Sequence, residues 1–178
     1  MKQRILFATL ASLVSLNVYA NTYVGAALGL QDIRQSTSKF RGWRPGVFFG
    51  YGSMMDMDAR SFYLAGELAA SWVSTISNTY VSRVQSLRMA PEISVSLIPG
   101  TILKPDLMGY LRFGVAEAKQ IEPNRWLEAA ILGAGLEYEM TPCWSVRGEL
   151  DYSFFSNTNV GSPASWDGIL SFKYTYDV

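Results

Sequence analysis

Histidine is absent from the 178-residue sequence, and cysteine occurs only once, at Cys143. Without histidine the chain lacks the side chain that most often serves as a general acid or base, which disfavours the commonest hydrolytic enzymes. A single cysteine cannot form an internal disulfide bond. The 15 basic and 15 acidic residues balance, which argues against a nucleic-acid partner and against a polybasic membrane anchor.

Long apolar runs are also missing, except for one at the N-terminus. This run follows Lys2 and Arg4, covers residues 5–18 and leads to the small residue Ala20. The order is typical of a secretory signal peptide. An uncleaved membrane helix is the alternative, but the run is short and polar residues interrupt it. We therefore expect residues 1–20 to be a cleaved signal peptide and residues 21–178 to form one exported domain.

The segment from Ala130 to Phe155 shows the pattern that the rest of the chain repeats. Apolar residues such as Leu136 alternate with charged residues such as Glu137 and Arg147. A period of two residues is that of a β-strand, and Pro142 in the sequence Thr-Pro-Cys marks a tight turn. The segment is therefore predicted to be a β-hairpin with a turn at residues 141–143.

The same alternation predicts eight strands. They cover residues 22–32, 43–52, 61–74, 87–97, 107–116, 130–140, 144–155 and 166–178. Loops or turns are predicted at residues 33–42, 53–60, 75–82, 98–106, 119–125 and 156–165. Pro91 falls within a strand, where its missing N–H predicts a β-bulge.

One face of every predicted strand lacks charged, amide, Ser and Thr residues, while the other carries charges among Gly, Ala and Ser. A lipocalin-like carrier would turn the apolar face inward, and a membrane barrel would turn it toward lipid. Long strands, aromatic residues near strand ends and a small-residue inner face favour the membrane barrel. We therefore predict an all-β, eight-stranded antiparallel up-and-down transmembrane β-barrel.

The charged face is expected to form a structural polar network inside the barrel. Its predicted members are Glu67, Arg88, Glu92, Arg112, Glu137, Glu139, Arg147, Glu149, Asp151 and Lys173. Carboxylates this close together could support acid/base catalysis, but charges of both signs are better explained as buried pairs. An eight-stranded barrel is also filled by its side chains, so a pore is not expected. We expect no catalytic, cofactor or metal site.

A basic cluster in the first predicted loop is the main candidate for a surface interaction. It consists of Arg34, Lys39, Arg41 and Arg44. Such residues could contact lipopolysaccharide phosphates or an anionic host surface. An ordinary solvated loop explains them equally well. Cys143, in a turn, is expected to be an unpaired thiol.

Four segments carry a resemblance to a known family: YVGAALG from Tyr23, GVFFGYG from Gly46, YLRFG from Tyr110 and GLEYEMTPCWSVRGELDY from Gly135. Together with the signal peptide, they resemble the outer-membrane β-barrel family of Gram-negative bacteria related to OmpX and to the transmembrane domain of OmpA. The resemblance implies termini and short turns in the periplasm and loops facing outward. It also implies insertion by the barrel-assembly machinery, although the chain ends in Val178 where such proteins commonly end in an aromatic residue.

The resemblance implies a monomeric protein of the cell outer membrane that contacts its lipid and lipopolysaccharide, without the periplasmic domain of OmpA-type proteins. Lipid-modifying enzymes and proteases among outer-membrane barrels depend on a histidine, which this chain lacks. We expect a structural role or a surface-recognition role in which the loops contact an unknown surface ligand. A soluble lipocalin-like carrier and a barrel enzyme acting on lipid are the alternatives.

Overall fold

The structure, a computed structural model, describes residues 20–35, 38–57, 60–72, 76–78, 86–87, 89–120, 125–156 and 164–176. The described elements are all strands: β1 (Ala20–Gln35), β2 (Ser38–Met57), β3 (Arg60–Ser71), β4 (Ile76–Asn78), β5 (Ser86–Leu87), β6 (Met89–Lys104), β7 (Leu107–Gln120), β8 (Arg125–Thr141), β9 (Trp144–Phe155) and β10 (Ala164–Tyr176). No helix that could cross a membrane occurs among these residues. Val178 and residues 1–19 of the predicted signal peptide lie outside them.

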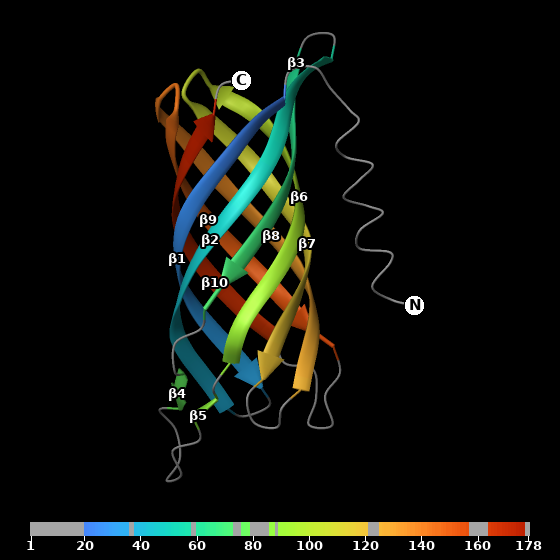
Figure 1. The fold of residues 1–178 in the computed structure, drawn as a ribbon, viewed down its shortest axis with the longest axis vertical. Coiled ribbons are helices and arrows are strands. Elements are labelled where there is room, and N and C mark those ends of the chain that lie inside the picture. The colour runs from blue at the N-terminus through green and yellow to red at the C-terminus, as the bar shows by residue number, and fades with distance from the viewer. Residues whose placement is uncertain are drawn as a thin grey trace.

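Eight long strands close into a barrel. Each is antiparallel to the next along the chain in the order β1, β2, β3, β6, β7, β8, β9, β10, and β10 pairs back with β1 from Thr22–Tyr176 to Arg34–Ala164. Figure 1 shows the strands tilted around one barrel, with β4 and β5 at the end opposite to the end of β10. The predicted eight-stranded up-and-down barrel is confirmed.

Short turns gather at the end of the barrel where β1 begins and β10 ends. Pro105 and Asp106 connect β6 to β7, and Pro142 and Cys143 connect β8 to β9. The predicted turn at residues 141–143 is therefore confirmed. The bulge predicted at Pro91 is confirmed as well, because the pairing of β6 with β7 shifts register between Met89 and Glu92.

The strands are longer than the sequence pattern indicated, so several predicted loops are wrong. The described residues of the loop predicted at 33–42 all belong to β1 or β2, and the turn predicted at 98–106 is strand up to Lys104. The segments predicted as loops at 53–60, 119–125 and 156–165 are likewise shortened by the ends of neighbouring strands, and β4 lies within 75–82. The loops were predicted from polar residues that follow the apolar part of each strand, but the backbone pairing of the strands continues through these polar residues.

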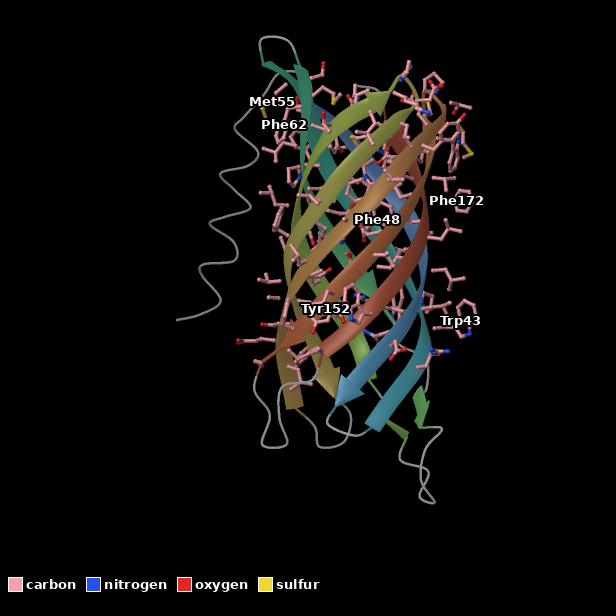
Figure 2. The ribbon with its side chains drawn as sticks, turned by 180° about the vertical axis from the view of Figure 1, so that it is seen from behind. Trp43, Phe48, Met55, Phe62, Tyr152 and Phe172 are labelled. Carbon is pink, nitrogen blue, oxygen red and sulfur yellow. The ribbon has the colours of Figure 1, made fainter. Side chains whose placement is uncertain are left out.

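The outer wall is apolar, as the alternation predicted. Many large hydrophobic side chains of the long strands are exposed, among them Leu28, Phe113, Leu132, Leu150 and Leu170. Figure 2 shows Trp43 and Phe172 projecting away from the barrel, whereas Phe48 is buried. Aromatic contacts occur toward both ends of this wall, including Trp144 with Tyr174 and Tyr152 with Trp166.

Two clusters of buried apolar and aromatic side chains pack inside the barrel, and the rings of the second contact Arg147. One consists of Ile33, Ala116, Ala118, Leu127, Ala129, Ile131 and Phe155. The other consists of Tyr23, Phe48, Tyr63, Ala65, Ile98 and Tyr110. Tyr23 lies over Gly50 of the neighbouring strand, where an added Cβ would approach the ring to 2.0 Å. Glycine is therefore required at position 50 so that the tyrosine ring can lie across the lumen.

Candidate functional site

Charged side chains from seven strands meet in the lumen of the barrel. Eight members of the predicted network are buried there: Glu67, Glu92, Arg112, Glu137, Arg147, Glu149, Asp151 and Lys173. Two further charged residues that the prediction did not include, Arg44 and Asp167, are buried with them. Isolated charges are costly to bury, so the geometry of their pairing decides what this site can do.

Arg147 on β9 is the most deeply buried of the large side chains in this network, with 1% of its surface exposed. Its Nε donates to Glu137 Oε2 at 2.6 Å, and its Nη1 donates to Glu67 Oε2 at 2.7 Å. Its guanidinium carbon also lies 4.9 Å from the centre of the Tyr23 ring. Arg147 faces inward, as the alternation predicted. Its charged and aromatic contacts join β1, β3, β8 and β9.

Arg112 on β7 is the second centre of the network. Its Nη2 donates to Glu67, and its Nε lies 3.1 Å from Glu149 Oε1 and 4.0 Å from Asp151 Oδ2. Its Nη1 reaches the hydroxyl of Ser96 at 3.5 Å. Because Glu67 contacts both Arg112 and Arg147, these two arginines form one continuous network across the lumen.

Arg44 corrects the prediction of a basic surface cluster. It lies on β2 and points into the barrel, where it pairs with Glu92, with Asp167 at 3.2 Å and with the hydroxyl of Ser71 at 2.9 Å. The surface assignment was wrong because Arg44 already lies within the predicted strand at 43–52, where it has the same parity as Phe48 and therefore shares its inward face. The predicted network did not include Asp167, although this residue has the same parity as Lys173 on β10 and therefore faces inward.

The remaining members of that surface cluster lie on the hairpin of β1 and β2. Arg34 and Lys39 are cross-strand partners, and their side chains lie outside the described residues. Arg41 is exposed and forms an ion pair with Asp32 at 3.3 Å.

Two residues predicted for the interior network are not among its observed members. Arg88 lies outside the described residues, and Glu139 is exposed near the β8–β9 turn instead of being buried.

Aromatic side chains contribute to the interior in a way that charge alternation did not predict. The hydroxyl of Tyr23 donates to Glu67 Oε2 at 3.2 Å, so this tyrosine joins the ion-pair network directly. Lys173 pairs with Glu137 and lies 5.0 Å from the centre of the Tyr23 ring. The sequence did contain a signal for these inward aromatic residues, because Tyr23, Phe48 and Tyr110 alternate with apolar residues of the outer face.

The cavities among the described residues follow from this packing. A mouth of about 800 Å³ opens at the end with the short turns, and Lys173 and Glu137 are among the residues that line it. A space of about 50 Å³ near the middle of the barrel is lined in part by Arg44, Arg112 and Asp151. Ion-paired residues line both spaces, and their pairs crosslink the strands across the lumen.

We expect Asp151→Asn to leave the free energy of unfolding unchanged or to raise it by up to about 1 kcal/mol. Among the described residues the lumen buries six carboxylates and four cations, and Asp151 Oδ1 has no hydrogen-bond donor. Removing this charge therefore costs little. The matched change Glu67→Gln should lower the free energy of unfolding by about 3 kcal/mol, because Glu67 pairs with two arginines. Denaturant titration in lipid vesicles measures the free energy of unfolding of both variants. An equal loss would contradict the conclusion that Glu67 is stabilised by its two arginines and Asp151 is a surplus charge.

Comparison with known proteins supports the fold. No protein-family model and no curated protein sequence matches the chain. The structure is similar to that of Neisserial surface protein A, with a TM-score of 0.63, 15% identity, and coverage of 88% of this chain and 99% of that one. It is also similar to Ail, the attachment invasion locus protein of Yersinia pestis, in complex with the heparin analogue sucrose octasulfate. There the TM-score is 0.53, with 13% identity and coverage of 89% and 100%.

A lower similarity, with a TM-score of 0.48, links the structure to the outer membrane enzyme PagL at 14% identity and coverage of 85% and 98%. At these identities the likenesses concern the fold alone. The chain therefore has the closed barrel architecture found in small bacterial outer-membrane proteins, while its role follows from its own residues.

Proposed function

We propose that the chain is a small integral protein of the Gram-negative outer membrane with a structural or surface-recognition role. The observation that carries this proposal is the inverted distribution of side chains. Large hydrophobic residues cover the outer wall, while ten charged residues are buried in the lumen. A closed barrel satisfies its backbone hydrogen bonds internally, and an apolar outer wall then faces hydrocarbon at no electrostatic cost.

A soluble carrier of the lipocalin type fits these residues less well. Such a protein needs an apolar cavity for its ligand and a polar outer surface. Here the lumen is occupied by Arg112, Arg147 and their carboxylate partners, and the outer surface is apolar. The same packing supports a barrel that is neither a pore nor an enzyme, because the carboxylates that could act as acid and base are buried among arginines.

The proposed orientation places the termini and short turns in the periplasm. The hairpin of β1 and β2 then projects outward with Arg34, Lys39 and Arg41, the last of which is exposed. Ail, which shares the fold, was solved with a polyanionic heparin analogue. We propose that this hairpin contacts anionic groups such as lipopolysaccharide phosphates, and that the barrel acts as a monomer.

The membrane location is tested by exporting the chain and separating soluble from membrane fractions. The barrel should remain with the outer membrane, need detergent for extraction, and migrate differently on gels before and after boiling. A mature chain that stays soluble without detergent would overturn the proposal in favour of a carrier.

We expect Lys39→Glu with Arg41→Glu to weaken binding of the detergent-solubilised barrel to immobilised lipopolysaccharide by about tenfold or more, since two cations become anions. Lys104→Glu is the matched control, because Lys104 is an exposed lysine at the opposite end of the barrel. Surface plasmon resonance at several salt concentrations measures the effect. Equal binding by all three proteins would remove the recognition role and leave the structural one.

A further inference from the structure

A groove of about 670 Å³ crosses the outer wall of the barrel from Trp144 at the start of β9 over β10, β1, β2 and β3 to β6. Its lining is apolar or aromatic, and no charged residue contributes to it. The network in the lumen does not explain this feature, which lies on the opposite side of the strands. Its shape follows from two adjacent rows of side chains.

The floor of the groove is a row of small residues flanked by larger ones. Successive cross-strand partners in this row are Phe172, Ala26, Val47, Ala70 and Ile93. Phe172 and Ile93 project from the wall at its two ends, each with about half of its surface exposed. Between them lie the shorter side chains of Ala26, Val47 and Ala70, which project less far from the wall on three neighbouring strands.

A second row, two residues further along each strand, forms one side of the groove. Its successive partners are Trp144, Tyr174, Val24, Phe49 and Leu68. Phe49 and Leu68 are exposed and stand above the small residues of the floor. Trp144 and Tyr174 pack edge to face at 4.9 Å, at the end of the barrel that carries the short turns. Aromatic pairs of this kind lie at the headgroup level of a membrane.

The dimensions of the groove suit a single hydrocarbon chain. The row from Phe172 to Ile93 spans four strand spacings, and its floor, from Ala26 to Ala70, spans two of them, or about 10 Å at about 4.8 Å per spacing. One leaflet of a bilayer contributes about 15 Å of hydrocarbon thickness, so a single acyl chain is long enough to lie across this floor. A stable contact with a second copy of the protein would bury on the order of 1,000 Å², far more than a floor of three small side chains offers.

We propose that this groove binds one acyl chain of a phospholipid, with its headgroup at the level of Trp144 and Tyr174. The proposal rests on the membrane location proposed above, because only a wall that faces hydrocarbon meets such a chain. It adds a specific lipid site to a surface that otherwise contacts lipid without selection. Ala26, Val47 and Ala70 bind the chain by leaving room for it, and Phe49 and Leu68 hold it from one side.

The experiment uses the full mature barrel in vesicles of phosphatidylethanolamine and phosphatidylglycerol, extracted into mild detergent and analysed by native mass spectrometry. The wild-type barrel should retain one phospholipid. Ala70→Phe, which fills the floor, should lower the retained fraction by about tenfold, equivalent to about 1.4 kcal/mol. Ala134→Phe is the matched control, because Ala134 is an exposed alanine on the outer face of β8 and does not line the groove.

A gel shift on boiling verifies that each variant is folded, and Ala26→Phe serves in place of Ala70→Phe if the latter does not fold. Equal lipid retention by the floor variant and the Ala134→Phe control would overturn the site. A dimer that Ala70→Phe abolishes would assign the groove to a second copy of the chain instead. A barrel that needs no detergent would contradict the membrane location itself, so the two proposals fail separately.

Discussion

Arg147→Met should lower the free energy of unfolding by about 3–5 kcal/mol, the usual cost of removing one partner from a buried ion pair. Arg147 donates to Glu67 and to Glu137, and its guanidinium lies over the ring of Tyr23. Methionine retains much of the volume but leaves both carboxylates with one cation fewer. Denaturant titration of the barrel in lipid vesicles, followed by tryptophan fluorescence, measures the loss.

Arg41→Met is the matched control for that prediction. Arg41 is exposed and forms a single ion pair with Asp32, so its loss should cost no more than about 1 kcal/mol. The double variant Arg147→Met with Glu67→Gln should lose less than the sum of the single changes, because fewer buried charges remain unpaired. Equal losses for Arg147→Met and Arg41→Met would show that the lumen network does not hold the barrel together.

Leu132→Arg should destabilise the barrel in vesicles by about 2–4 kcal/mol, the cost of an arginine on the lipid face near the bilayer midplane. Leu132 is exposed on the outer wall and lies near the middle of β8. An arginine placed there must remain in hydrocarbon or distort the bilayer to reach water. Equilibrium unfolding in vesicles, with folded and unfolded fractions separated on unboiled gels, measures the change.

The position of Leu132 makes this substitution informative about the environment of the outer wall. Leu103→Arg is the matched control, because Leu103 is equally exposed but lies next to the β6–β7 turn, where an arginine reaches water and should cost about 0–1 kcal/mol. If the barrel were soluble, both arginines would face water and neither would destabilise it. An unchanged stability for Leu132→Arg would therefore contradict the membrane location.

Eight of the ten residues predicted for the inner face are buried in the lumen, but the sequence did not indicate which of them pair with one another. Alternation assigns Arg147 and Glu149 to the inner face because a strand presents every second residue on one side. It does not reveal that Arg147 meets Glu67 across the lumen, eighty positions away, while Glu149 meets Arg112. Such pairs depend on barrel closure and on how far each long side chain reaches.

Residues near strand ends were the hardest to assign. Arg44 was grouped with the basic residues of the preceding loop, yet it is the second residue of the predicted strand at 43–52, and its parity directs it into the lumen, where it pairs with Asp167. Glu139 was predicted inside from its alternation, but the register of β8 with β9 shifts between Glu139 and Thr141, and the side chain is exposed at the mouth. Local irregularities of this kind are not encoded in a two-residue period.

The sequence alone determined the number of long strands, the alternation of inner and outer faces along them, the tight turn at Pro142 and the bulge at Pro91. These features are local, because they depend on alternation and on the backbone restrictions of proline. The tertiary structure decided the rest: the pairing of β1 with β10, the continuous network through Glu67, and the groove over Ala26, Val47 and Ala70. Each depends on the cross-strand register, which places residues side by side that are far apart in the chain.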